Sequence, residues 1–283
     1  MCLIALALDQ HPRYPLVIAA NRDEFFERPA AALGWWQPEP NAPPILAGRD
    51  LQAGGTWLGL SASGRVAMLT NVRDLPRHRA TAASRGAIVP AWLAGDASAD
   101  AFWHDMAPQA HNPFNLLAGD ALQGRWWWAD DRASAPQALG PGLYGLSNAA
   151  LDTPWPKVLR LKTAVADALN AAPTTSDFES RLFAALADRF GVPDDALPDT
   201  GVALVRERWL APAFIRTPDA RYGTRCSTLL VAERHAAGMS VSLVERQFSG
   251  DGTAIAQRRV RFDNWPAAVN ALPTVAIEPL NAG

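Results

Sequence analysis

Two nearly continuous apolar runs open the chain, and they constrain its fold more than any other feature of the sequence. Cys2–Leu8 and Pro15–Ala20 are separated by the short polar segment Asp9–Arg13, which contains a proline. Two such runs around a turn predict a β-hairpin. A strand with one solvated face alternates apolar and polar residues, whereas these runs do not. We therefore expect other layers to cover both faces of the hairpin.

The rest of the sequence contains strand-like and helix-like segments without a linker or an internal repeat. The predicted strands are 56–60, 65–71, 115–120, 125–129, 142–147, 226–233, 240–247 and 257–262, and the predicted helices are 84–93, 99–106, 155–170 and 178–189. The Pro-rich stretch 29–44 is predicted to be irregular. Strands dominate both ends and helices fill the middle, so we expect residues 1–283 to form a single α+β domain with stacked sheets.

The composition is that of a globular protein and argues against several functional classes. Hydrophobic residues make up 49% of the chain and charged residues 19%, which leaves ample apolar material for a core. The net charge of −2, from 26 basic and 28 acidic residues, indicates no affinity for nucleic acid. No apolar run approaches the ~20 residues of a membrane span, so we predict no stable membrane insertion. The sequence does not indicate any protein partner.

The cysteines and histidines suggest a cytoplasmic protein without a cofactor. Two cysteines are too few for a disulfide framework. The first apolar stretch has no basic residue before it and is a poor signal peptide. The five histidines are scattered without metal-ligand spacing, and no glycine-rich phosphate-binding motif is present. We therefore predict no resident metal or cofactor.

Cys2 is the first candidate for chemistry. A small residue at position two usually allows removal of Met1, which would leave Cys2 with a free α-amine beside its own thiol. The amine titrates near pH ~8 and a free thiol near ~8.5, so one can serve as the base for the other. A nucleophile with its own base suits acyl transfer. The alternative is a small apolar residue that opens a buried strand.

Four polar residues, Asn21 to Glu24, follow the second apolar run abruptly. Asp23 could hold the amine or the thiol of Cys2 in place if the two runs pair. Arg22 could steer an anionic group or keep a nearby thiol ionised. On an ideal strand Asn21 and Asp23 share one face, and Arg22 and Glu24 share the other. The alternative is a solvated turn after a buried strand.

Three further polar residues lie at the predicted ends of strands. Asn71 ends an apolar strand, where its amide is suited to donate to an oxyanion, and Asn148 has the same character. A turn-forming asparagine is the alternative for both. Arg225 precedes an apolar strand and could face the site. Strand alternation would then turn Cys226 the opposite way, so we interpret Cys226 as structural.

These features together resemble the NRDE family, also called the transport-and-Golgi-organisation type 2 family. The matching segments are 1–4, 20–25, 47–50, 54–59, 70–73, 145–148, 151–158 and 222–228, which run in order through nearly the whole chain. These segments contain Asn21, Arg22, Arg49, Trp57 and Arg73, which we expect to bind a ligand.

The family is in turn similar to the N-terminal nucleophile hydrolases, and within them to the choloylglycine hydrolases and penicillin V acylases. This resemblance implies a four-layer αββα sandwich. It implies a nucleophile at Cys2, a carboxylate beside it at Asp23 and an oxyanion donor at Asn71. It also implies a second site asparagine at Asn148 and a late arginine at Arg225.

One position departs from that group. Its early arginine precedes the aspartate by three residues, where this chain has Ala20, and Arg22 is instead adjacent to Asp23. The resemblance implies an amidohydrolase or acyltransferase that acts on a small, non-peptide acyl amide or ester. The alternative is a non-catalytic protein that reuses the fold to bind or traffic haem or a lipid derivative. The 11 tryptophans would suit such a flat apolar ligand.

Overall fold

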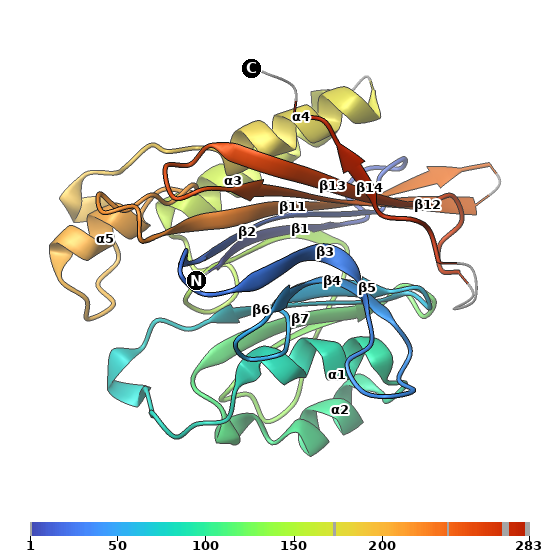
Figure 1. Cartoon of the computed structure of the whole chain (residues 1–283), viewed down its shortest axis with the longest axis horizontal. Coiled ribbons are helices and arrows are strands. Elements are labelled where there is room, and N and C mark those ends of the chain that lie inside the picture. Colours follow the sequence, from blue (N-terminus) through green and yellow to red (C-terminus); the bar gives the residue numbers. More distant parts are fainter. Residues whose placement is uncertain (1, 172–173, 237, 268–271, 281–283) are drawn as a thin grey trace.

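The computed structural model describes residues 2–171, 174–236, 238–267 and 272–280, and it confirms the α+β class (Figure 1). The described part contains two seven-stranded sheets, whose strand pairs are all antiparallel, and five α-helices. In spatial order, the first sheet consists of β10 (Gly142–Leu146), β1 (Cys2–Leu8), β2 (Leu16–Phe25), β11 (Tyr222–His235), β12 (Gly238–Phe248), β13 (Ala254–Phe262) and β14 (Ala276–Glu278).

The second sheet follows the chain order from one edge to the other. It consists of β3 (Ala30–Trp36), β4 (Ile45–Asp50), β5 (Leu58–Ser61), β6 (Arg65–Asn71), β7 (Phe114–Asp120), β8 (Arg125–Asp130) and β9 (Gln137–Leu139). The helices are α1 (Ile88–Ala94), α2 (Ala99–Met106), α3 (Pro156–Ala171), α4 (Thr175–Leu186) and α5 (Leu204–Leu210). Among the described residues, no helix is long and apolar enough to cross a membrane.

The opening hairpin β1–β2 is covered on both faces, as its sequence predicts. Ile4, Leu6 and Ile18 belong to the core between the two sheets. Leu3 and Val17, on the opposite face, pack against side chains of α3 and α4. Figure 1 shows the two sheets face to face, with α3 and α4 beyond the first. Each fully buried aliphatic side chain contributes about 1.5–3 kcal/mol, so the hairpin is a central element of the core.

The outer face of the second sheet packs against α1 and α2 (Figure 1). The core there is rich in tryptophan, and Trp92, Trp103 and Trp127 are in edge-to-face contact with ring centroids 5.2 to 6.3 Å apart. Much of the aromatic content of the sequence is thus used in packing, where large rings bury the most apolar area.

Two segments differ from the sequence-based expectation. The Pro-rich stretch 29–44 was expected to be irregular, but it contains β3, because residues on either side of a register shift pair with β4 and Leu33 is fully buried. The helix predicted at 84–93 is divided into a 3-10 turn, Arg85–Ala87, and α1. Pro90 lies in the first turn of α1, where its missing N–H has no intrahelical partner to lose. The elements β4, α5, β9 and β14 were not predicted.

Candidate active site

The polar residues at one end of the first sheet lie side by side on three adjacent strands. Cys2 on β1 is paired in register with Arg22 on β2, and Arg22 is paired with Cys226 on β11. Directly opposed residues of antiparallel strands project from the same face of the sheet. The three side chains therefore form a row that faces the second sheet.

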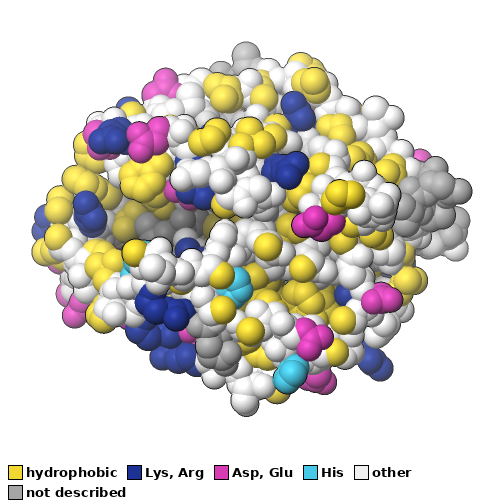
Figure 2. All heavy atoms as spheres, turned by 60° about the horizontal axis from the view of Figure 1, so that its bottom comes forward, with side chains coloured by type: hydrophobic (Ala, Val, Ile, Leu, Met, Phe, Trp, Pro, Cys, Tyr) yellow, Lys and Arg dark blue, Asp and Glu magenta, His cyan; other side chains and the backbone are white. Residues whose placement is uncertain are grey.

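A cavity of about 250 Å³ lies beside this row, between the ends of the two sheets. From the first sheet it is lined by Cys2, Arg22, Asp23, Glu24, Arg225, Cys226, Glu245 and Gln247. From the second sheet and its loops it is lined by Arg28, Ala30, Ala31, Gly48, Arg49, Asp50, Ala53, Thr56, Trp57, Leu69, Asn71, Ala82, Ala83, Ser84, Arg85, Gly86 and Asn112. Figure 2 shows this side of the molecule hollowed, with Lys and Arg side chains in and beside the hollow.

The Cys2 thiol is buried at the inner end of this arrangement. Only 6% of the residue is exposed, and burial raises the pKa of its thiol to about 11. The Arg22 guanidinium favours the thiolate and opposes this increase in the pKa. At neutral pH the thiol therefore keeps its proton, and it needs a base before it can attack a carbonyl carbon.

Asp23 lies on the other face of β2 from Arg22 and is fully buried there. Its Oδ1 accepts a hydrogen bond of 2.7 Å from the Thr224 hydroxyl, and burial raises the pKa of the carboxyl. A buried lysine that the sequence analysis did not single out, Lys157 on α3, interacts electrostatically with Asp23. The Lys157 Nζ donates to the Leu210 carbonyl at 3.0 Å, and burial lowers the pKa of Lys157 to about 8.

Asn71, at the end of β6, brings the second sheet to the cavity. Asn148 does not line the cavity, but its Nδ2 donates to the Asn71 carbonyl at 2.8 Å. The Ser147 hydroxyl lies 3.0 Å from the Cys2 carbonyl oxygen and 3.2 Å from Asn148 Oδ1. The pair Ser147–Asn148 therefore connects the backbone of the cysteine to the backbone of the candidate oxyanion donor.

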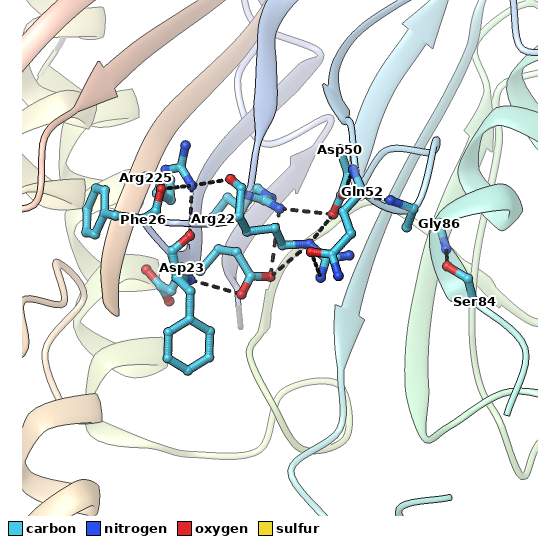
Figure 3. A network of polar contacts seen from close by, with 12 residues as sticks. Arg22, Asp23, Phe26, Asp50, Gln52, Ser84, Gly86 and Arg225 are labelled. Carbon is cyan, nitrogen blue, oxygen red and sulfur yellow. Dashed lines mark hydrogen bonds and ion pairs between the residues drawn. The ribbon is translucent and has the colours of Figure 1, made fainter. Parts of the chain in front are cut away.

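An ion-pair network crosses from the first sheet to the second at the cavity wall. Arg28 Nε lies 2.6 Å and Arg22 Nη2 lies 3.4 Å from Asp50 Oδ2, at the end of β4. Figure 3 shows Arg22 and Asp50 pointing toward one another, with Ser84 and Gly86 beyond Asp50. Burial is the largest single influence on Asp50 and disfavours its ionised form, but the hydrogen bonds from Arg28 and the Ala53 N–H, together with the charges of Arg28 and Arg22, outweigh it and lower the pKa of Asp50.

Arg225 holds the chain segment that follows β2. Its Nη1 donates to the carbonyl oxygens of Phe25 and Arg28, both at 2.8 Å (Figure 3). Cys226 lines the cavity together with Arg225, which corrects the expectation that strand alternation separates them. The reason is a β-bulge between Thr224 and Cys226, where two residues on β11 match one step on β2.

Both cysteines are free thiols. Because β2 lies between β1 and β11, the Cα atoms of Cys2 and Cys226 are two strand spacings apart, or ~10 Å. A disulfide needs Cα atoms within ~7 Å, so these two cysteines cannot form one without backbone movement.

Two sequence-predicted binding residues lie outside the cavity. The Asn21 Nδ2 donates to the carbonyls of Leu186 and Ala213, both at 2.8 Å, so its side chain connects β2 to the helical side of the sheet. Arg73 lies 2.6 Å from Glu207 in a buried ion pair. Neither residue lines the cavity, because the Asn21 amide is used by these carbonyls and Arg73 lies beyond the end of β6 in its ion pair.

The other two predicted binding residues, Arg49 and Trp57, line the cavity, and so does Arg85, which sequence reasoning missed. Arg85 belongs to the loop between β6 and α1, and no periodic pattern in the sequence distinguishes it from the arginines around it. Lys157 was missed for a related reason, since it reads as an ordinary first-turn residue of an amphipathic helix.

The arrangement can support nucleophilic chemistry by a buried thiol. The structure describes Cys2 but not Met1, so the expected removal of Met1 concerns a residue outside the described part. Within the described ranges, no group of three or more His, Cys, Asp or Glu side chains could hold a metal ion.

Comparisons with known proteins give a consistent family. The family model described as Transport and Golgi organisation 2 matches residues 1–250. The Transport and Golgi organization protein 2 homolog of Bos taurus is 34% identical over 268 residues, which cover 88% of this chain and 94% of that protein. The homolog of Homo sapiens is 32% identical over 267 residues, which cover 88% of this chain and 95% of that protein.

Among solved structures, a mutant conjugated bile acid hydrolase from Clostridium perfringens aligns over 99% of this chain and 97% of its own, with a TM-score of 0.45 and 9% identity.

Proposed function

The chain belongs to the Transport and Golgi organisation 2 family, and we propose that it is an N-terminal-cysteine amidohydrolase or acyltransferase acting on a small acyl amide or ester. The two facing sheets, with helices on their outer faces, support an αββα sandwich of the N-terminal nucleophile type as its fold. The observation that carries the proposal is that Cys2, Asp23 and Asn71, from three separate strands, line one cavity.

The first half of the proposed reaction forms an acyl-enzyme. The α-amine of Cys2, free after removal of Met1, takes the thiol proton, and Sγ attacks the substrate carbonyl carbon. The Asn71 side-chain amide donates to the oxyanion, which stabilises charge that develops only in the transition state. The resulting ammonium gives its proton to the leaving nitrogen or oxygen, the bond to the carbonyl carbon breaks and a thioester remains on Cys2.

The second half releases the acyl group. Water, or an acceptor amine in a transferase, loses a proton to the α-amine as it attacks the thioester, and the proton returns to the cysteine sulfur as the C–S bond breaks. Asp23 stabilises the ammonium whenever it forms. Arg22 and Arg85, which both interact electrostatically with Cys2, stabilise the thiolate before attack.

The alternative role, binding of haem or a lipid derivative, receives less support from this cavity. Trp57 is the single aromatic side chain among the described lining residues, and none of those residues is a histidine. Charged side chains instead make up much of the wall. A haem titration of wild type and Cys2→Ala would detect such a role, since binding by the thiolate would give a Soret band that the variant lacks.

The proposal is tested first at the sulfur itself. Intact mass and Edman sequencing of purified protein should show Cys2 as the first residue. Iodoacetamide should then alkylate Cys2 in preference to Cys226. Cys226 is an internal control, because it lines the same cavity and is equally buried, at 6% exposure, but has no amine beside it. Retention of Met1, or equal alkylation of both cysteines, would count against the mechanism.

The second test is turnover. Wild type, Cys2→Ser and Cys2→Ala are assayed against a panel of small acyl amides, thioesters and esters, with product acid and amine measured by mass spectrometry. We expect wild type alone to turn over at a substantial rate. Activity that survives in Cys2→Ala would remove the cysteine from the mechanism.

A further inference from the structure

Residues 147–149, which follow β10, contact both sheets at the end of the molecule that holds Cys2. We call these three residues the strap. The ladder between β10 and β1 ends two residues short of Cys2. Beyond it, the Ser147 hydroxyl lies 3.0 Å from the Cys2 carbonyl oxygen and 3.2 Å from Asn148 Oδ1, so two acceptors share its one proton. The Ser147 side chain therefore links the strap to the backbone of Cys2.

The strap is also bound to the second sheet, at two neighbouring strands. At the end of β6, the Asn148 Nδ2 donates to the Asn71 carbonyl at 2.8 Å, and the Arg73 N–H donates to the Asn148 carbonyl at 2.8 Å. On β7, the Asn115 Nδ2 donates to the Ala149 carbonyl at 2.8 Å. These hydrogen bonds hold two consecutive strap residues against the second sheet.

Asn115, which holds the strap on β7, was not singled out by the sequence. It is fully buried, and its Nδ2 also donates to the Thr70 hydroxyl at 3.1 Å, while its Oδ1 accepts from the Trp128 indole N–H at 3.2 Å. The amide therefore uses both of its N–H groups and its oxygen. A buried polar group with all of its partners in place is costly to move, so the strap is anchored to a fixed point of the second sheet.

Cys2 and Asn71 have to act together although they belong to different sheets. The core between the sheets is apolar, and apolar packing is non-directional, whereas a hydrogen bond fixes both distance and direction. In the described part of the chain, the Asn71 side chain makes no hydrogen bond, so its amide is positioned through its backbone. An oxyanion donor has to lie within ~0.5 Å of its productive position. The strap, which binds the backbones of both residues, is suited to set this position.

From these contacts we infer that Ser147 is a positioning residue of the proposed reaction, which holds the Cys2 thiol and the Asn71 amide at the separation that acyl transfer needs. This inference rests on the proposed function. Ser147 is buried and does not line the cavity, so it does not touch the substrate. It acts through Asn71, and its loss should weaken the stabilisation of the oxyanion without changing the nucleophilicity of the thiol.

The first test is the effect of Ser147→Ala on turnover. We expect kcat to fall by about 5- to 10-fold with little change in KM, the usual effect of one lost hydrogen bond. Ser147→Thr keeps the hydroxyl and should restore most of the rate. Iodoacetamide should alkylate Cys2 in Ser147→Ala at a rate within about 2-fold of wild type, because alkylation forms no oxyanion. An unchanged kcat in Ser147→Ala would overturn the inference.

A double-mutant cycle with Asn71→Ala tests whether Ser147 acts through Asn71. When the oxyanion donor is already absent, Ser147→Ala should lower kcat by less than about 2-fold, because the group that it positions is gone. Equal fold losses of kcat in the two backgrounds would assign Ser147 an independent structural role and contradict the inference.

Ser227→Ala is the matched control. Ser227 is as buried as Ser147, at 1% against 3% exposure, and its hydroxyl donates to Asn21 Oδ1 at 2.6 Å, away from the cavity. Both variants lose one buried hydrogen bond and should lose similar stability in urea, but only Ser147→Ala should lose kcat. An equal loss of kcat in both variants would make the effect a general result of destabilisation and count against the positioning role.

Crystal structures separate this inference from the proposed function, because they need no turnover. Compared with wild type, Ser147→Ala should displace Asn71 and Cys2 relative to each other by more than about 0.5 Å, and Ser227→Ala should not. Such a displacement in a protein that turns over none of the acyl substrates would support the strap and contradict the hydrolase. Turnover by Cys2, with neither a displacement nor a loss of kcat in Ser147→Ala, would support the hydrolase and contradict the strap.

Discussion

Asn71 and Arg73 lie two residues apart in one segment shared with the family, yet they belong to two different kinds of buried polar region. Asn71 lines the cavity beside Cys2, where arginines outnumber carboxylates. Arg73 pairs with Glu207 at 2.6 Å, and the Thr200 side chain and N–H both donate to the same carboxylate. The region around Asn71 has more positive than negative side chains and can accept an anionic ligand. In the region around Arg73, the positive charge is paired with a carboxylate of the protein itself.

The partners of a polar residue at the end of a strand indicate its role. A buried arginine with a carboxylate partner of its own stabilises the fold, and a buried arginine without one is available to a substrate. Shared sequence segments do not separate these cases, because both residues belong to the same Thr-Asn-Val-Arg segment. Measurements of activity and of stability on the same variants do separate the two cases.

The largest effect is expected for Cys2→Ala. Loss of the nucleophile should lower kcat by at least roughly 1,000-fold, because no other described thiol has a free amine beside it. Thermal and urea denaturation should show a change of about 1 kcal/mol or less, because the substitution removes one small side-chain atom. Steady-state kinetics on the best substrate check the first statement. A comparable kcat in wild type and variant would show that Cys2 is not the nucleophile, and the region around Asn71 would then have no catalytic role that distinguishes it from the region around Arg73.

Glu207→Ala tests the region around Arg73. Removal of one partner from a buried ion pair leaves the other uncompensated, so we expect the free energy of unfolding to decrease by about 3–5 kcal/mol. Urea denaturation measures it. The folded variant should keep its kcat, since Arg73 is outside the cavity. Glu27→Ala is the control, because the exposed pair Glu27–Arg221 contributes at most about 1 kcal/mol.

Asn71→Ala should lower kcat by about 100-fold with little change in KM, because an oxyanion donor acts mainly in the transition state. Asn148→Ala removes the hydrogen bond to the Asn71 carbonyl, which is 2.8 Å long, and is expected to have a smaller effect on kcat. Single-turnover kinetics would locate both effects in acylation. A larger effect for Asn148 would transfer the donor role away from Asn71.

Lys157→Met is expected to have the smallest effect, a shift in pH dependence. Lys157 has a pKa of about 8, so it is charged below that pH and neutral above it. Its charge lies close to Asp23 and lowers the proton affinity of the nearby amine of Cys2. Without that charge the amine should titrate higher, and the acidic limb of kcat/KM should move up by as much as about one pH unit. The curves should converge above pH 8.

Lys162→Met is the control for that experiment, since Lys162 lies on the same helix and pairs at 2.6 Å with Asp152, away from the cavity. An equal shift in both variants would indicate a general change in surface charge. A shift of the limb to lower pH in Lys157→Met would contradict the proposed electrostatic role of Lys157.

The parts of the fold that the sequence predicts well are those with strong local patterns. The hairpin β1–β2 has uninterrupted apolar runs, and α3 has a clear helical period. β3 was missed because the prolines on either side of it and its own Gly34 suggest an irregular chain, and only its pairing with β4 makes it a strand. Such pairing depends on tertiary structure and outweighs local propensity.

The candidate site was predictable in part for the same reason. Cys2 and Asp23 each stand at one end of an apolar run, and the pairing of β1 with β2 brings them together, whereas Asn71 at the end of β6 reaches them because the two sheets face each other. Arg85 reaches the cavity through a loop contact with residues about 30 positions earlier, and Lys157 reaches Asp23 from a helix more than 130 positions later. No local pattern encodes these approaches. The first depends on how the loops of the second sheet pack together, and the second depends on how α3 packs against the first sheet.

The β-bulge in β11 has a consequence for the length of that strand. Thr224 pairs with Asp23 and Cys226 with Arg22, so Arg225 is a supernumerary residue between two pairs that are already in register. Excision of Arg225 would leave a regular ladder with both neighbours still matched, and it would also release the clamp on the carbonyls of Phe25 and Arg28. A similar chain that lacks this one residue would thus keep the pairing of β11 with β2 but lose the hydrogen bonds that hold the segment after β2.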